Sequence, residues 1–148
     1  MPDSTTKYLT VCISDKWCGI DVSKIIEVLH FMAFEDVPTR RNDILGFVTV
    51  RNEIMPLIDM RRRFGITNAE FKMDTPIVAL RETCGSVALI FDSANQVEDI
   101  QSAQITPLQD SEQFPDIYGV AKLSNRLILL LETNRISKEI HSADDIQG

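Results

Sequence analysis

The sequence has few of the residues on which disulfide-stabilised and metal-binding proteins depend. It contains three cysteines and two histidines among 148 residues. An odd number of cysteines with no C-x-x-C pair fits reduced thiols better than a disulfide framework. His30 and His141 lie far apart in the chain and offer no set of ligands for a transition metal. We therefore expect no metal site and no cofactor.

The chain also lacks the short motifs that accompany common enzymatic chemistries. It contains no G-x-x-x-x-G-K-S/T, G-x-G-x-x-G, G-x-S-x-G or H-E-x-x-H. Acidic pairs, Asp21 with Glu27 and Asp92 with Glu98, have the chemistry for acid–base catalysis. Because such a pair occurs in both halves of the chain, we favour structural roles for these residues, in helix capping and at strand edges. We expect no catalytic residue and a function other than catalysis.

Long apolar runs and an excess of positive charge are absent as well. Apolar runs such as Leu127–Leu131 are far shorter than the roughly 20 residues that a membrane-spanning helix needs. Residues Met1–Lys7 are polar and do not resemble a secretory signal. The formal net charge of -7 disfavours sequence-independent binding to nucleic acid. These features predict a cytoplasmic protein that neither inserts into membranes nor binds nucleic acid.

What the sequence does contain is a series of short apolar segments separated by turns. Hydrophobic residues make up 44% and charged residues 25% of the chain, which is usual for a globular domain. The alternation of Leu9, Val11 and Ile13 with their neighbours is typical of a half-buried strand. Further strands are predicted at Trp17–Ile20, Gly46–Val50, Glu53–Ile58, Ile77–Leu80, Val87–Phe91, Gln96–Gln101, Tyr118–Leu123 and Arg126–Leu131, and a helix at Thr133–Ile140.

Two further short helices are predicted in the first half. Asp21 can cap a helix over Val22–Leu29, where apolar residues follow at helical spacing. Asp59 can cap a second helix, which Gly65 can end. The three arginines 61–63 would then lie near the C-terminus of that helix, on a solvated face.

The two halves of the chain share an internal repeat. Gly46–Asn52 matches Gly119–Asn125 in residue type at an offset of 73 residues. Ile20-Asp21 matches Phe91-Asp92 at an offset of 71 residues. The repeat and the short strands predict a mainly β fold of two small five-stranded β-barrel subdomains packed around a shared hydrophobic core, with short helices. Residues 7–140 would form this single domain, with flexible tails at residues 1–6 and 141–148.

The hairpin within Gly46–Phe64 is the candidate functional centre. Its tip is Arg51-Asn52, and Asn tolerates the positive φ angle of a tight turn. The residue equivalent to Arg51 in the second copy is Ser124, so the turn itself does not require an arginine. An exposed arginine beside apolar residues suits protein–protein recognition, because the guanidinium offers five donors and a flat apolar face.

On these segments the chain resembles the CheW family, the coupling proteins of bacterial chemosensory arrays. The resemblance runs from about Tyr8 to Ile140. It rests on Cys18-Gly19-Ile20-Asp21 followed by Ile25, Glu27 and Val28, on Gly46-Phe47-Val48-Thr49-Val50-Arg51-Asn52-Glu53-Ile54-Met55-Pro56-Leu57-Ile58-Asp59-Met60-Arg61, and on Tyr118-Gly119-Val120-Ala121 through Leu127–Leu131. The middle block is the most specific, and Asn52 stands in it where the family usually has Gly.

The resemblance implies two five-stranded barrels with a hydrophobic groove between them. It also implies two protein partners: the cytoplasmic tip of a methyl-accepting chemoreceptor and the regulatory domain of a CheA-type histidine kinase. The protein would then be recruited to membrane-bound receptor arrays. Carried over position by position, the receptor-facing residues are Ile25, Glu27, Val28, Gly46 and Arg51. The kinase-facing residues stay unknown.

The leading hypothesis is a non-catalytic adaptor that couples chemoreceptors to a histidine kinase in a bacterial chemosensory array. One alternative is a stand-alone competitor or regulator of such a kinase in a non-flagellar pathway, such as twitching motility. The sequence does not separate these two, because both would bind the same partners. The other alternative is a small-ligand-binding β-barrel, which a deep apolar cavity with convergent polar groups would favour.

Overall fold

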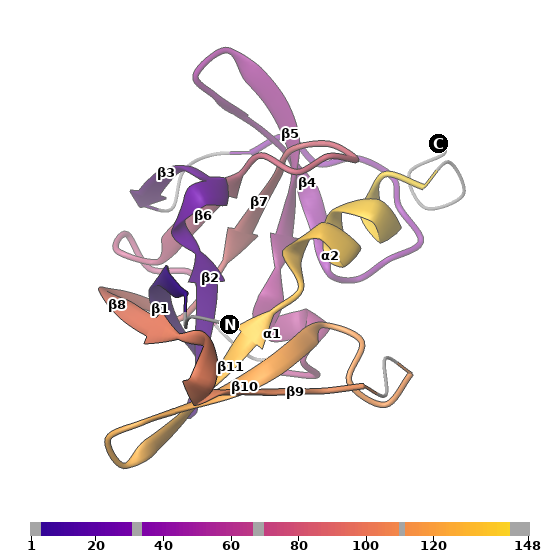
Figure 1. The fold of residues 1–148 in the computed structure, drawn as a ribbon. Coiled ribbons are helices and arrows are strands. Elements are labelled where there is room, and N and C mark those ends of the chain that lie inside the picture. The colour runs from indigo at the N-terminus through magenta and orange to yellow at the C-terminus, as the bar shows by residue number, and fades with distance from the viewer. Residues whose placement is uncertain (1–3, 31–33, 67–69, 110–111, 143–148) are drawn as a thin grey trace.

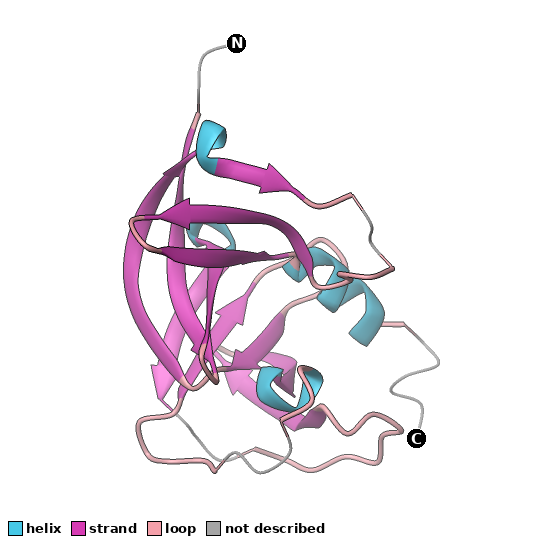
Figure 2. Cartoon of the chain, turned by 90° about the horizontal axis from the view of Figure 1, so that it is seen from below, coloured by secondary structure: helices cyan, strands magenta, loops and turns pink. Residues whose placement is uncertain are grey.

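The computed structural model describes residues 4–30, 34–66, 70–109 and 112–142. Strands predominate there and the helices are short (Figure 2). None of these helices has both the length and the apolar composition that crossing a bilayer requires. The strands are β1 (Thr5–Ile13), β2 (Lys16–Asp21), β3 (Ile25–His30), β4 (Ile44–Val50), β5 (Glu53–Asp59), β6 (Pro76–Leu80), β7 (Val87–Ile90), β8 (Ser93–Gln101), β9 (Ile105–Pro107), β10 (Ile117–Leu123) and β11 (Arg126–Leu131). The α-helices are α1 (Met60–Arg63) and α2 (Thr133–Ile140), and the 3-10 helices are η1 (Val22–Lys24) and η2 (Ser102–Gln104).

The strands form two sheets. The six-stranded sheet has the order β8-β1-β2-β11-β10-β9, and the five-stranded sheet has the order β3-β6-β7-β5-β4 (Figure 1). The prediction of a mainly β fold with two subdomains is confirmed. One sheet has a strand more than expected, because Ile105–Pro107 pairs with β10 instead of forming part of a loop. Both sheets end in edge strands, and no strand pairing among the described residues closes either of them into a barrel.

Both hairpins of the internal repeat are present. β4–β5 and β10–β11 each contain an irregularity at the same place, between Ile44 and Gly46 in one hairpin and between Ile117 and Gly119 in the other. Directly after these hairpins come α1 and α2. The turns of the two hairpins lie at opposite ends of the molecule (Figure 1).

The third strand of each copy pairs with the other copy. β3 and β8 are equivalent, since Glu27 and Glu98 are related by the 71-residue offset. β3 pairs with β6, whereas β8 pairs with β1. The six-stranded sheet therefore combines β1 and β2 from the start of the chain with β8–β11 from its end. Because the copies exchange strands in this way, no single cut in the chain separates the two subdomains.

The helix predicted over Val22–Leu29 is wrong. Asp21 does act as a cap, since its side chain accepts a hydrogen bond of 2.9 Å from the backbone N–H of Ser23. The helix that it caps is only the 3-10 turn η1, and the chain continues as β3 from Ile25. Ile25, Ile26 and Val28 are β-branched, which favours a strand, and pairing with β6 supplies the backbone hydrogen bonds.

The ends of the domain differ slightly from the prediction. Thr5 and Thr6, expected in a flexible tail, belong to β1, and Thr5 pairs with Gln101. α2 has the predicted bounds and is followed by His141. Residues 1–3 and 143–148 of the two expected tails lie outside the described residues.

A shared hydrophobic core joins the subdomains, as predicted. It takes buried side chains from both sheets and from α2, including Val11 and Ile20 of the six-stranded sheet, Leu89 of the five-stranded sheet, and Ile136. A second cluster belongs to the five-stranded sheet and a third to the six-stranded sheet. Strands β6 and β7 supply the shared core with one face and the second cluster with the other. Burial on both faces explains their uninterrupted apolar sequences.

Arg61, which was predicted on a solvated helix face, is buried. Its side chain is 2% exposed. Its Nε donates to Asp59 Oδ1 at 3.0 Å, and its Nη1 donates to the Glu70 carbonyl at 3.0 Å and to Asp92 Oδ1 at 3.3 Å. A buried charge needs such partners, because an unpaired one carries a desolvation cost of several kcal/mol. The prediction was wrong because two of these acceptors come from segments outside the helix.

Arg63 is also buried, and it links the two subdomains. Its Nε and Nη2 donate to Asp116 at 2.7 and 2.9 Å, and its Nη1 donates to Asp43 at 3.1 Å. A further ion pair joins it to Glu139 of α2. Asp43 precedes β4 of the five-stranded sheet, and Asp116 precedes β10 of the six-stranded sheet. The two aspartates are equivalent in the repeat, so one arginine binds the same position of both copies.

The ion network around Arg63 shifts the pKa values of its members. Burial by itself would raise the pKa of Asp43, but hydrogen bonds and charge from Arg41 and Arg63 outweigh it and hold that pKa below its usual range. The pKa of Glu139 is lowered in the same way, against the effect of burial, mainly by Arg63. Both carboxylates are therefore charged at neutral pH.

We expect the substitution Arg63→Ala to lower the free energy of unfolding by about 3 kcal/mol, because it removes the cation that binds the buried Asp116 and one of the two arginines that bind the buried Asp43. The matched control is Arg62→Ala, whose side chain is 37% exposed, and we expect it to cost less than about 1 kcal/mol. Urea denaturation measures both. Equal losses in the two variants would contradict a linking role for Arg63.

Acidification should weaken the same network. The folded-state pKa values of Asp43 and Glu139 lie below their unfolded values, so their contribution to stability is present above about pH 4 and is lost as the pH falls through the folded-state values. Urea denaturation at about pH 7 and about pH 3 should show a smaller loss of stability in Arg63→Ala than in the unsubstituted protein. An equal loss in both proteins would show that other carboxylates dominate the acid response.

Candidate protein-binding site

Strand β3 forms one edge of the five-stranded sheet and carries three of the predicted receptor-facing residues. It pairs with β6 on one side, with an irregularity between Ile25 and Glu27. No strand among the described residues pairs with its other side. We call the exposed part of β3 together with the tip of the β4–β5 hairpin the β3 surface, defined by Ile25, Glu27, Val28 and Arg51.

An exposed ion pair joins β3 to the hairpin tip. Arg51 and Asn52 both have positive φ angles, 51° and 68°, which confirms the prediction of a tight turn at this tip. The Nε of Arg51 donates to Glu27 Oε1 at 2.9 Å. The turn joins β5 to β4, which is one edge of the five-stranded sheet, whereas β3 is the other edge. The Glu27–Arg51 ion pair therefore connects the two edges of this sheet. The structure therefore places together two predicted residues that lie 24 positions apart.

The Glu27–Arg51 ion pair contributes little to the stability of the fold. The Arg51 side chain is 66% exposed and the Glu27 side chain 34% exposed. Exposed ion pairs contribute at most about 1 kcal/mol to stability, because water screens the charges and ordering the side chains costs entropy. Both groups remain accessible to the charges of a partner protein.

One apolar residue of the β3 surface, Val28, borders a cleft between the subdomains. Val28 is 45% exposed, whereas Ile25 is half-buried and packs against the shared core. The cleft has a volume of about 290 Å³. Its lining includes Val28, Leu29 and His30 from the end of β3, and Asp92, Ser93 and Ala94 at and before the start of β8. Since β3 and β8 belong to different sheets, this cleft lies between the two subdomains.

Gly46, the fifth predicted receptor-facing residue, lies apart from the other four. It is buried near the start of β4, and the hairpin tip lies beyond the other end of that strand. A Cβ atom at Gly46 would lie 1.9 Å from the carbonyl oxygen of Glu35. Glu35 and Phe47 exchange two backbone hydrogen bonds at this point, of 3.0 and 2.9 Å. The close approach of two backbones is thus sufficient reason for a glycine here.

Sequence reasoning missed two exposed apolar residues, Ile54 and Leu127. They are 71% and 57% exposed, and each is the second residue of the strand that follows its hairpin turn. They were overlooked because apolar residues in strands were expected to be buried. Their spacing of 73 residues is the repeat offset, so the repeat carried a signal that could have identified them.

Comparison with known proteins agrees with this architecture. Residues 7–141 match the family model of the CheW-like domain. The chain belongs to this family. The chemotaxis protein CheW of Thermotoga maritima is 29% identical over 135 residues, which cover 90% of this chain and 89% of that protein. The chemotaxis protein CheW of Helicobacter pylori is 24% identical over 139 residues, which cover 93% of this chain and 84% of that protein.

A solved structure shows the same fold. The scaffolding protein TtCheW from Thermoanaerobacter tengcongensis superposes with a TM-score of 0.79 at 23% sequence identity. The superposition covers 87% of this chain and 90% of that one. Two sheets around a shared core are therefore the architecture of a CheW-like domain, and the resemblance inferred from the sequence motifs is confirmed.

The two predicted receptor-facing residues of the β4–β5 hairpin, Gly46 and Arg51, should differ in how much their substitution lowers stability. We expect Gly46→Ala to lower the free energy of unfolding by more than about 2 kcal/mol, because its new methyl group meets the Glu35 backbone. Arg51→Ala should change it by less than about 1 kcal/mol, because the side chain is exposed. Urea denaturation of both variants measures this difference, and a large loss of stability in Arg51→Ala would show that Arg51 is structural.

Proposed function

We propose that this chain is a non-catalytic coupling protein that binds the cytoplasmic tip of a chemoreceptor and the regulatory domain of a CheA-type histidine kinase, and so connects the two in a chemosensory array. Membership of the CheW-like family supports this proposal. The observation that carries it is the accessible Glu27–Arg51 pair, which lies on the same strand edge as Val28 and the cleft between the subdomains.

The β3 surface has the properties of a groove that receives a helix. Binding of this kind combines apolar anchors on one helix face with a few polar contacts that fix the register. Val28 and the cleft beside it supply apolar contact area. Glu27 and Arg51 supply one charge of each sign, and both can exchange their mutual contact for contacts with the partner because they are exposed. The receptor tip is a helical hairpin and fits this description.

An adaptor also needs a second surface for its other partner. The turn of the β10–β11 hairpin lies at the opposite end of the molecule from Arg51 (Figure 1). Leu127 gives this hairpin an exposed apolar side chain, and burying apolar surface against a partner favours association. We place the kinase-binding surface at this hairpin, so that both partners can bind at once.

Two substitutions on the β3 surface test the receptor contact. We expect Val28→Asp and Arg51→Ala each to raise the dissociation constant for a receptor-tip fragment at least about tenfold, because each removes a contact at the centre of the surface. Isothermal titration calorimetry measures the constant. The matched controls are Val28→Ile, which keeps an apolar side chain, and Lys122→Ala, which removes an exposed cation from the other sheet. Both controls should bind as the unsubstituted protein does.

Unchanged binding in both Val28→Asp and Arg51→Ala would contradict the β3 surface as the receptor contact.

Kinase activity separates the adaptor from a competitor. In a reconstituted mixture of receptor fragment and kinase, an adaptor raises the activity and a competitor lowers it.

A further inference from the structure

Two neighbouring cavities lie beside α2, away from the β3 surface. The larger cavity, of about 750 Å³, separates α2 from the segment around Phe114 and Ile117. The smaller cavity, of about 490 Å³, is formed by the segment before β4, α1, α2 and Asp116. Pro115 and Arg135 line both cavities, so the two adjoin each other. Small-molecule ligands occupy pockets of about this size.

The smaller cavity carries a surplus of positive charge in an acidic protein. Five arginines and three carboxylates line it, which leaves two positive charges, whereas the formal net charge of the whole chain is -7. The carboxylates are those of Asp43, Asp116 and Glu139. All three are engaged by arginine side chains of the cavity. The local surplus therefore opposes the charge of the protein as a whole.

The surplus comes from the rim of the smaller cavity. Arg41 and Arg63 form the ion pairs with the three carboxylates, so these five side chains together carry one negative charge, which the other three arginines of the lining outweigh. Arg62 donates to the Asn42 carbonyl at 3.2 Å, and its Nε forms a long ion pair of 3.8 Å with Asp59 Oδ2. That aspartate is itself bound to the buried Arg61. Arg40 is exposed on the same rim.

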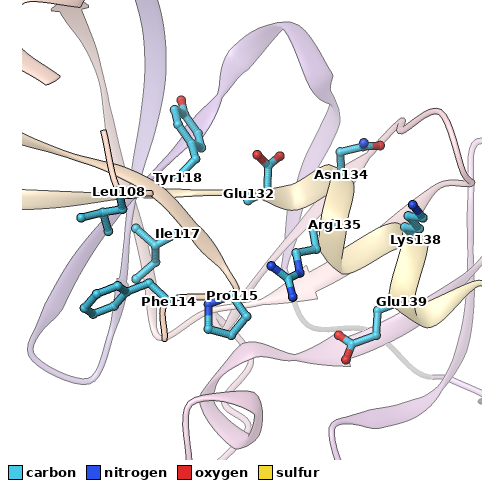
Figure 3. Close-up of a pocket in the computed structure, with 10 residues that line it drawn as sticks. All are labelled: Leu108, Phe114, Pro115, Ile117, Tyr118, Glu132, Asn134, Arg135, Lys138 and Glu139. Atoms are coloured by element: carbon cyan, nitrogen blue, oxygen red, sulfur yellow. The ribbon is translucent and has the colours of Figure 1, made fainter. Parts of the chain in front are cut away.

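The larger cavity offers an apolar wall next to this charge. Phe114, which is 40% exposed, lies on one side together with Leu108 and Ile117, and α2 forms the other side with Arg135 and Lys138 (Figure 3). In Figure 3 the Arg135 side chain lies between the apolar side and Glu139. A ligand that spans both cavities would meet aromatic and aliphatic contacts at one end and guanidinium groups at the other.

We propose that the two cavities form a binding site for an organic phosphate of the nucleoside diphosphate class. Guanidinium groups suit phosphate because their fixed donors form paired hydrogen bonds to its oxygens. The phosphate groups bind at Arg40 and Arg62, above the ion network of Arg63, and the ring system lies against Phe114 and Ile117. The site uses residues outside the β3 surface, so ligand binding and receptor binding are independent measurements.

Titration of the ¹⁵N-labelled protein by NMR tests the site, with adenosine diphosphate, inorganic pyrophosphate and adenosine as probes at low salt. Pyrophosphate should shift the amide signals of Arg40, Asn42 and Arg62. Adenosine diphosphate should shift these and those of Phe114 and Ile117, and it should bind at least about tenfold more tightly than adenosine, because adenosine lacks the phosphates that the arginines bind.

The variant with both Arg40→Gln and Arg62→Gln should bind adenosine diphosphate at least about tenfold more weakly, whereas the control Lys122→Gln should bind it unchanged. An unaltered spectrum elsewhere shows that the double variant is folded. Any of three results would overturn the proposal: dissociation constants above about 1 mM for both phosphates, equal weakening in the Lys122→Gln control, or shifts induced by adenosine diphosphate with none at Phe114 or Ile117.

Discussion

The structure depends on one buried ion network, in which Arg63 binds Asp43 and Asp116. Each aspartate precedes the hairpin of its own copy, and its carbonyl accepts the backbone N–H of the residue before the following helix, from Asp59 at 2.8 Å and from Glu132 at 2.7 Å. The backbone arrangement is thus the same in both copies. The cation comes from one copy alone, because the residue equivalent to Arg63 is Ile136, which lies in the shared core. An ion network thus joins the subdomains beside their shared apolar core.

The exchange of β3 and β8 explains why the proposed receptor-binding surface lies at the boundary of the subdomains. β3 forms an edge of the five-stranded sheet, and β8 forms an edge of the six-stranded sheet. The cleft beside Val28 is formed by the end of one strand and the start of the other. The same exchange that makes the domain inseparable also creates an exposed strand edge beside a cleft, which is a suitable place to bind a partner.

Five arginines of the sequence fall into three groups that composition cannot distinguish. Arg61 and Arg63 are buried and bind carboxylates, so they stabilise the fold. Arg51 is exposed and pairs only at a hairpin tip with Glu27, so it is available for recognition. Arg40 and Arg62 lie on the rim of a cavity whose carboxylates are already bound to other arginines. Burial and the supply of acceptors decide these roles, and both are properties of the folded chain.

The sequence by itself determined the mainly β fold, the repeat, the turn at Arg51-Asn52, the helix α2 and the family, because alternation, turn residues and motif spacing are local properties of the chain. Tertiary structure decided the rest. Residues 25–29 became a strand because β6 supplies hydrogen bonds that a local pattern does not reveal. Glu27 forms an ion pair with Arg51, and Arg63 with Asp116, because strand exchange and sheet order bring distant segments together. Which charged residues are buried depends on such long-range contacts, so their roles could not be predicted from periodicity.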